Sequence, residues 1–240
     1  MSAVIDTVRA GKFEIPVLYE DNHLLVVVKP ANMVVQADDT GDLDLLTALK
    51  QYIGEKYQKP GAVYLGLVHR LDRPVGGVMV FARTSKAASR LSEQFAAHHA
   101  GKIYLAVAQG IIDSEARLTD YLKKDAKTGM VRAVSANTPG AKHAILTTTP
   151  LAHMNGNTLV RVQLETGRAH QIRVQHQHMG HPLWGDARYG GGKPGQQIAL
   201  WAYRLTLTHP TQKSEMTFTH LPPHNGAWRD FADVIGSLND

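Results

Sequence analysis

The 240-residue sequence contains no cysteine. This excludes a disulfide framework and any metal site built on thiolates. The sequence also lacks an apolar run of the roughly 20 residues that span a bilayer, and its N-terminus lacks the hydrophobic region of a signal peptide. We therefore expect a globular protein that resides in the cytoplasm and has no membrane partner.

Acidic residues are fewer than basic ones. The chain has 21 Asp and Glu against 26 Lys and Arg, which gives a formal net charge of +5. This excess mildly favours a polyanionic partner such as a nucleic acid. The sequence shows no apolar stripe that would mark a subunit interface, so we expect a monomer.

Short apolar runs separated by turn signals predict strands that are joined by hairpins. Two runs in residues 16–29 flank Glu20-Asp21-Asn22, and Pro30 ends the second run because it has no N–H to donate. Asn155-Gly156 is typical of a tight hairpin. Further strands are predicted at 78–81, 103–107, 143–149, 158–166 and 198–208. This pattern favours an α+β fold with a mainly antiparallel sheet.

Four helices are predicted between these strands. We expect Asp42 to cap the first helix and Thr84 to cap the second. A third lies within GRAHQIRVQHQHMG and is stopped by Gly180 and Pro182, and a short fourth lies near residues 231–238. The apolar stripes of the first two comprise Leu45, Leu46, Leu49 and Ile53, and Ala88, Leu91 and Phe95.

Two further motifs suggest a phosphate-binding loop and a metal site, but neither meets the requirements of such a site. The loop GGGKPG, at residues 190–195, is expected to be mobile, but it has Pro194 where a phosphate-binding loop needs Ser or Thr. His176, His178 and His181 suggest a metal-dependent hydrolase, yet their spacings do not share a helix face. We expect no metal site and interpret these histidines as solvated or RNA-facing.

The stretch VHRLDRPVGGV places Asp72 among His69, Arg70 and Arg73. By charge alone, Asp72 is most simply an ion-paired aspartate at the end of a strand. Gly76-Gly77 follows it and indicates a close approach of another backbone segment.

Four motifs resemble those of the RluA-type pseudouridine synthases, which isomerise uridine in RNA to its C-linked form. VHRLDRPVGGVMVFARTSKAASRLSEQF resembles the HRLD signature region of that family. TGRAHQIRVQHQHMGHPLWGDARYG is similar to its GR-x-HQIR…GHP…GD-x-x-YG region. YEDNHLLVVVKPANMVV and AGKIYLAVAQG resemble its opening hairpin and its tyrosine-bearing strand. The motifs occur in the order of the family.

The resemblance implies the pseudouridine synthase fold, a mainly antiparallel mixed sheet with helices and loops around a central RNA-binding cleft. It implies one catalytic domain at residues 16–240, after an N-terminal extension at 1–15 and without an S4-like RNA-binding domain. Two positions depart from the family: Val28 stands where Asn is usual, and Trp201 where His is frequent.

The resemblance also implies roles for individual residues. Asp72 matches the catalytic nucleophile, Tyr104 matches the tyrosine that stacks on the target base, and Arg173 matches the arginine that pairs with the catalytic carboxylate. Arg70 matches the arginine that fills the space left by the flipped base, and Leu200 falls where an apolar residue packs on the uracil. Candidate contacts to the rest of the RNA are His69, Arg73, Lys86, Arg90, Lys102, Arg168 and His170.

The implied reaction breaks the bond from N1 to C1′ and joins C5 to C1′. It involves no redox change, so no cofactor is required, and a carboxylate suffices as the covalent partner. A guanidinium such as that of Arg173 would keep a partly desolvated carboxylate ionised. Asp72 could attack C1′ or C6, or act through a glycal. Whether the RNA is ribosomal or transfer RNA stays open, and a non-catalytic RNA-binding protein is the alternative function.

Overall fold

The computed structural model describes residues 1–193 and 196–238. The chain forms two compact units. Unit 1 comprises residues 1–100 and 202–220, and unit 2 comprises residues 101–201 and the C-terminal segment from Leu221. Among the described residues, no helix has the length and apolar character needed to cross a membrane.

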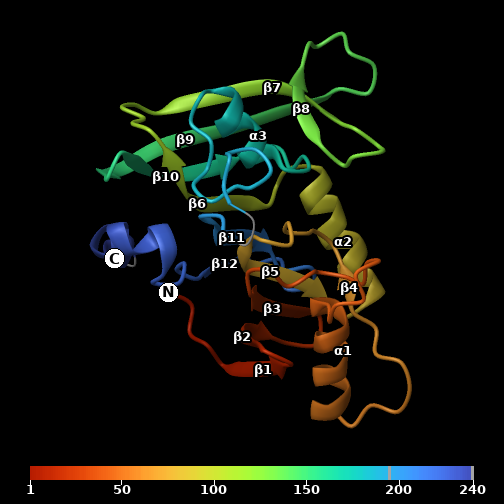
Figure 1. Cartoon of the computed structure of the whole chain (residues 1–240). Helices are drawn as coiled ribbons and strands as arrows, with labels where there is room; N and C mark the ends of the chain where they lie inside the picture. Colours follow the sequence, from red (N-terminus) through yellow and green to blue (C-terminus); the bar gives the residue numbers. More distant parts are fainter. Residues whose placement is uncertain (194–195, 239–240) are drawn as a thin grey trace. The chain divides into compact units, whose positions relative to one another are not determined.

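Unit 1 is built on a mainly antiparallel sheet with the strand order β1-β2-β3-β5-β11 (Figure 1). β12 pairs with β11, and the short β4 pairs with β5. The strands are β1 (Asp6–Ala10), β2 (Phe13–Glu20), β3 (Leu24–Lys29), β4 (Gly66–Leu67), β5 (Gly76–Ala82), β11 (Leu200–Thr208, which enters unit 1 at Ala202) and β12 (Glu215–Thr219).

The predicted hairpin of β2 and β3 is confirmed, and β3 ends at Lys29, directly before Pro30. β3 and β5 are the centre of this sheet, and every residue of both strands is buried. Strands that are buried on both faces read as continuous apolar runs, as LLVVV and VMVF do here. These two strands therefore form the core on which the unit 1 loops are built.

α1 (Leu45–Lys56) and α2 (Ser85–Ala96) pack along this sheet (Figure 1). Thr84 caps α2 as predicted, because its side chain accepts a hydrogen bond from the N–H of Ala87. The predicted cap of α1 was wrong. Asp44 accepts the N–H of Thr47, whereas Asp42 pairs with Arg73. Aspartate is favoured at an N-cap, so the sequence allowed either residue. The ion pair of Asp42 with Arg73, which is distant in sequence, leaves Asp44 as the cap.

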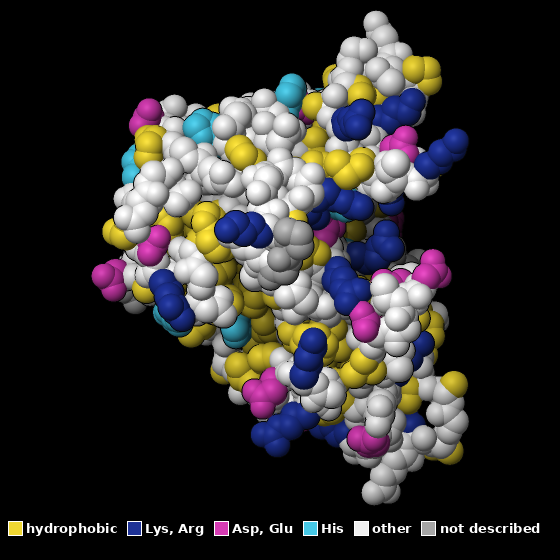
Figure 2. Space-filling model, in the orientation of Figure 1, with side chains coloured by type: hydrophobic (Ala, Val, Ile, Leu, Met, Phe, Trp, Pro, Cys, Tyr) yellow, Lys and Arg dark blue, Asp and Glu magenta, His cyan; other side chains and the backbone are white. Residues whose placement is uncertain are grey.

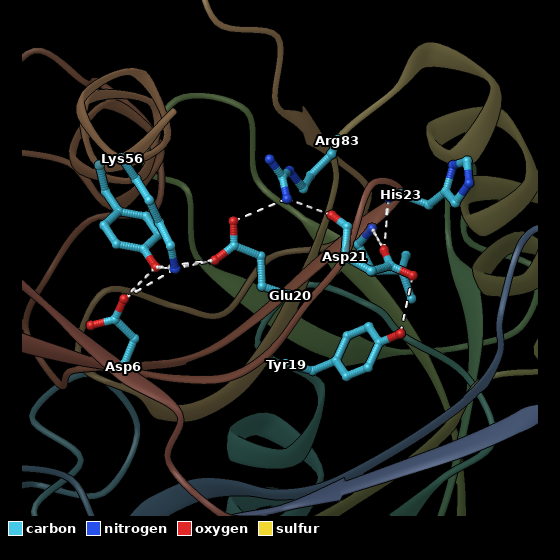
Figure 3. A network of polar contacts seen from close by, with 9 residues as sticks. Asp6, Tyr19, Glu20, Asp21, His23, Lys56 and Arg83 are labelled. Atoms are coloured by element: carbon cyan, nitrogen blue, oxygen red, sulfur yellow. Dashed lines mark hydrogen bonds and ion pairs between the residues drawn. The ribbon is translucent and has the colours of Figure 1, made fainter. Parts of the chain in front are cut away.

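The N-terminal residues 6–10, expected to be an extension, form β1 in register with β2. A polar network joins this strand to its surroundings (Figure 3). Lys56 contacts Asp6 at 3.1 Å and Glu20 at 2.9 Å, and Glu20 in turn pairs with Arg83 at 3.0 Å. The Glu20 side chain is only 4% exposed, so both cations are needed to offset the cost of burying its charge.

In unit 2 the sheet strands pair antiparallel in the order β6-β10-β9-β7-β8 (Figure 1). Its elements are β6 (Gly101–Gln109), β7 (Ala116–Lys124), β8 (Val131–Val134), β9 (Lys142–Met154), β10 (Asn157–Leu164), α3 (Gln171–His178), a short 3-10 helix (Gly226–Phe231) and α4 (Ala232–Ser237). Asn155 and Gly156 both have positive φ, as the predicted hairpin between β9 and β10 requires.

One face of this sheet packs against α3. Leu122 of β7, Val131 of β8 and Ala144 of β9 form a buried cluster with Val174 of α3. α3 ends at His178, before Gly180, as predicted. The expected mobile loop at 190–195 includes residues 194–195, which lie outside the described residues. The α+β class with mainly antiparallel pairing is confirmed in both units.

Candidate active site

Asp72 lies in the loop between β4 and β5 of unit 1 and is half-buried. The N–H of Val75 donates to the carbonyl of Asp72 at 3.0 Å and closes a turn around Arg73 and Pro74. Pro74 restricts the backbone of Arg73 before it, so few alternative conformations compete with this turn. The candidate nucleophile therefore sits on backbone that local sequence already constrains.

The side chain of Lys29 stabilises this turn. Its side chain is completely buried, and its Nζ donates to the carbonyls of Arg73 at 3.0 Å, Val75 at 2.8 Å and Pro30 at 3.0 Å. Burial lowers the pKa of Lys29 to about 7, and the negative charge of Asp72 opposes that shift. One buried amine thus ties β3 to both sides of the loop that holds Asp72.

The neighbours of Asp72 have different environments. His69 accepts the N–H of Val80 at 3.1 Å through Nε2, and its ring stacks on Phe95 at a centroid distance of 4.5 Å. Arg73 is exposed and pairs with Asp42, whereas Arg70 is exposed just before the buried Leu71. Arg70 is therefore accessible to solvent, and His69 is held by the protein itself.

Gly77 confirms the expected close backbone approach. A Cβ built on Gly77 would lie 2.3 Å from the carbonyl oxygen of Ala202 in β11, and its φ is +124°. Both the space and the conformation require glycine. The start of β5 is therefore fixed against β11 immediately after the Asp72 turn.

In unit 2, the loop before α3 positions three predicted site residues. His170 has a left-handed backbone, with φ of 52°, which is uncommon for a residue other than glycine. Gln171 stabilises this entry to the helix. Its Oε1 accepts from the N–H of Arg168 at 2.9 Å and from the hydroxyl of Thr166 at 2.8 Å.

Arg173 projects from α3 into a buried ion pair. Its Nε and Nη2 each donate to a separate oxygen of Asp186 at 2.8 Å. The exposed fractions of the two side chains are 7% and 0%. Asp186 also accepts the N–H groups of Arg188 and Tyr189, so the carboxylate itself is fixed. A two-point pair of this kind fixes the plane of the guanidinium as well as its position.

Tyr189 connects the Arg173 side chain to His170. The guanidinium of Arg173 lies 5.1 Å from the centre of the Tyr189 ring. The Tyr189 hydroxyl accepts the N–H of Val131 at 3.0 Å and lies 2.7 Å from Nδ1 of His170. Burial raises the pKa of Tyr189, so the hydroxyl stays protonated and can donate to His170. The structure thus brings His170 and Arg173 into one connected group.

The other predicted residues of unit 2 lie on β6, β11 and the loop after β10. Tyr104 is half-buried on β6, and Leu200 is buried at the start of β11. Burial lowers the pKa of Lys102, and the positive charge of Arg168 lowers it further. Asp72 belongs to unit 1 and Tyr104 and Arg173 to unit 2, so the pairing of Asp72 with Arg173 stays a prediction.

The interpretation of His176 as solvated or RNA-facing was wrong. Its ring is completely buried, Nδ1 donates to the carbonyl of Ile172 at 2.9 Å, and Nε2 lies 3.2 Å from the Thr148 hydroxyl. Both ring nitrogens are therefore engaged, and neither is available as a metal ligand. Among residues 1–193 and 196–238, no group of three or more potential ligands has a geometry suited to a metal.

Burial lowers the pKa of His176 from 6.5 to about 4, which predicts a specific loss of stability in acid. The unfolded chain protonates this ring below about pH 6.5, whereas the folded protein does so only below about pH 4. Wild type should therefore lose about 3 kcal/mol of unfolding free energy, relative to His176→Gln, between pH 7 and pH 4. Urea unfolding of both proteins at the two pH values measures this difference.

His224→Gln, a change at an exposed histidine, is the control and should leave the pH dependence of wild type unaltered. The same acid sensitivity in wild type and His176→Gln would contradict the prediction.

Sequence reasoning missed two residues of this region. Lys29 and Asp186 each lie within a quoted motif, but neither was predicted as a site residue. Asp186 lies in the quoted motif GDARYG, and the need of a buried arginine for an anionic partner was the signal that could have found it. No local pattern marks Lys29, because its three acceptors lie one residue and more than 40 residues away.

Comparisons with known proteins identify relatives of this chain. The family model described as RNA pseudouridylate synthase matches residues 23–178. The chain is 38% identical over 235 residues to ribosomal large subunit pseudouridine synthase D of Pseudomonas aeruginosa, covering 91% of this chain and 72% of that protein. It is 39% identical over 243 residues to the protein of the same name from Yersinia pestis, covering 94% and 71%.

Solved structures show the same fold. Human RNA Pseudouridylate Synthase Domain Containing 4 aligns with a TM-score of 0.72 at 23% identity, covering 93% of this chain and 92% of that one. The match of the family model spans the Asp72 loop, β6 and all of α3. The chain therefore belongs to the RNA pseudouridylate synthase family and is an enzyme that isomerises uridine in RNA to pseudouridine, as its four motifs predicted.

Proposed function

We propose that this enzyme modifies uridine in large-subunit ribosomal RNA. The observation that supports this target is the similarity to two relatives that are named ribosomal large subunit pseudouridine synthases, at 38% and 39% identity and over more than 70% of their length. The motifs alone left transfer RNA equally open. The proposal includes action as a monomer in the cytoplasm.

We assign Asp72 as the nucleophile. The target uridine must leave its stack before a carboxylate can reach it, which costs a few kcal/mol in a duplex and less in a loop. Arg70, exposed two residues before Asp72, would occupy the vacated space. Its guanidinium can stack on the neighbouring bases and donate hydrogen bonds to them. The rigid turn around Asp72 supports its assignment, because a nucleophile works best when its position is fixed.

Arg173 and Tyr104 complete the proposed catalytic set. Asp186 engages Nε and Nη2 of Arg173, but a guanidinium has five N–H donors, so its capacity exceeds that one pair. Arg173 would keep Asp72 ionised, while Tyr104 would supply a flat face and a hydroxyl to the uracil. Leu200 would pack on the base. His69, Arg73, Lys102, Arg168 and His170 remain proposed contacts to the RNA or supports of those contacts.

The alternatives are less well supported. A non-catalytic RNA-binding protein would have no use for an aspartate, a tyrosine and an arginine that all match the catalytic positions of the family. A metal-dependent hydrolase would need His176, whose two nitrogens are both engaged within the protein.

Mapping pseudouridine across all RNAs, in cells with and without this gene, tests the proposed target. We expect one or a few positions in large-subunit ribosomal RNA to lose pseudouridine when the gene is absent. Loss at positions in transfer RNA alone would overturn the proposed target but leave the isomerase activity standing.

A further inference from the structure

One face of the unit 2 sheet has exposed side chains on β7 and β8. Antiparallel residues that lie opposite each other point to the same face, and residues two apart along a strand do so as well. Tyr121 lies opposite His143, and Lys123 lies opposite Arg132. These four residues therefore share a face, which we call the β7–β8 face. Leu122 and Val131, with alternate orientation, lie in the cluster against α3 on the other side.

The charges on this face are unfavourable for the protein alone. Lys123 and Arg132 are exposed cations on directly opposed positions, an arrangement that destabilises a strand pair. Within the described part of the chain, neither forms an ion pair. The carboxylate of Asp125 accepts hydrogen bonds from the N–H groups of Thr128 and Lys127. These bonds lower the pKa of Asp125, and the positive charge of Arg132 lowers it further. A polyanion would relieve this repulsion.

Aromatic rings lie beside the two cations. The Tyr121 and His143 rings are 5.1 Å apart and tilted by 32°. His143 is exposed and Tyr121 is half-buried. Proteins that bind single-stranded nucleic acid combine such rings, on which bases stack, with cations that contact phosphates. An acidic protein surface would use the cations but has no need of a stacking platform.

The β7–β8 face is continuous with a predicted RNA contact. Arg168, which lies in the loop before α3, donates through Nε to the carbonyl of His143 at 2.8 Å. Beyond the face, Lys127 is exposed where the β7–β8 hairpin turns, and Lys124, which alternates to the opposite side of the sheet, is exposed beside it. Figure 2 shows Lys and Arg side chains gathered over this hairpin, at the upper right of the view. An RNA segment bound on the β7–β8 face could therefore continue toward Arg168.

We propose that the β7–β8 face, made of Tyr121, Lys123, Arg132 and His143, is a second RNA-docking surface for a single-stranded segment that flanks the target uridine. Lys123 and Arg132 bind its phosphates, and Tyr121 with His143 stacks on its bases. This inference deepens the proposed function and rests on it for the identity of the RNA.

The test measures the affinity of the full-length protein for in-vitro-transcribed large-subunit ribosomal RNA over a range of salt. Lys123→Gln combined with Arg132→Gln should raise Kd about tenfold near physiological salt and lower the slope of log K against log salt by about 2. Tyr121→Leu, which keeps an apolar side chain but loses the ring, should raise Kd about tenfold with an unchanged slope.

The combined variant should melt at the same temperature as wild type or higher, since a like-charge pair is removed. A matched control, Lys12→Gln with Lys59→Gln, removes two exposed cations of unit 1 and should change Kd less than twofold. The proposal would be overturned if the combined variant had the same Kd and the same salt slope as wild type. In that case an acidic protein would be the better candidate to occupy the face. Isomerisation by wild type is scored separately, so failure of the proposed function and failure of the docking surface are distinguishable.

Discussion

Asp72→Asn should lower the rate of isomerisation by at least about four orders of magnitude, because the amide cannot act as the nucleophile. The amide has nearly the same shape as the carboxylate, so the turn closed by Val75 should persist. The C5–H bond of uridine is lost when C5 joins C1′. Release of tritium from RNA that contains 5-tritiated uridine therefore measures each turnover directly.

The same variant should bind RNA within about twofold of wild type and unfold at a similar temperature. Asp39→Asn is the matched control, since Asp39 is an exposed aspartate in another loop of the same unit. It should retain full activity. A near-normal rate of tritium release in Asp72→Asn would show that another group is the nucleophile.

Lys29→Met should have the largest effect among changes outside the reacting groups. It removes the hydrogen bonds from Nζ to the carbonyls of Pro30, Arg73 and Val75, three from the ammonium or two at a time from the neutral amine, and leaves those acceptors unsatisfied in a buried site. We expect a loss of about 3 kcal/mol of unfolding free energy. Because the Asp72 turn loses its anchor, the turnover number should also fall by about 10- to 100-fold at a temperature where the variant is still folded.

The pH dependence distinguishes this role from ordinary core packing. Burial lowers the pKa of Lys29 from 10.5 to about 7, so between these values the unfolded chain binds the proton that the folded protein does not. Lys29 therefore makes wild type more stable as pH rises from 7. The difference in unfolding free energy between wild type and Lys29→Met should widen by about 2–3 kcal/mol from pH 7 to pH 9. Lys59→Met, at an exposed position, should show neither effect, and a constant difference would refute the assigned pKa.

Local signals were sufficient for much of the fold. The apolar runs of β3 and β5, the Asn155-Gly156 turn and the Thr84 cap each depend on neighbouring residues, and each was predicted. β7 was missed because its sequence ARLTDYLKK has only Leu122 fully buried and presents its other face to solvent. β1 was missed because it is short and is held by Lys56, which is 50 residues away. Neither strand has an apolar run of its own.

The residues of the candidate site could be predicted from the sequence, whereas most of the contacts around them could not. Asp72, Tyr104 and Arg173 could be assigned from the sequence because each lies in a motif of the family. The contacts around them could not. Asp186 meets Arg173 across 13 residues, and Lys29 meets the Asp72 turn across more than 40. The burial of His176 could not be predicted from the sequence either. It depends on the packing of α3 on β9 and not on the spacing of the histidines.

The sequence by itself determined the family and the reaction and predicted the catalytic aspartate, because residues that react must have a fixed chemical type and lie in motifs that can be read along the chain. Tertiary structure alone decided which buried groups contact those residues and which side chains of the unit 2 sheet are exposed. The physical reason is that burial and ion pairing depend on distances in space, and chain folding sets those distances between residues that have no relation in sequence.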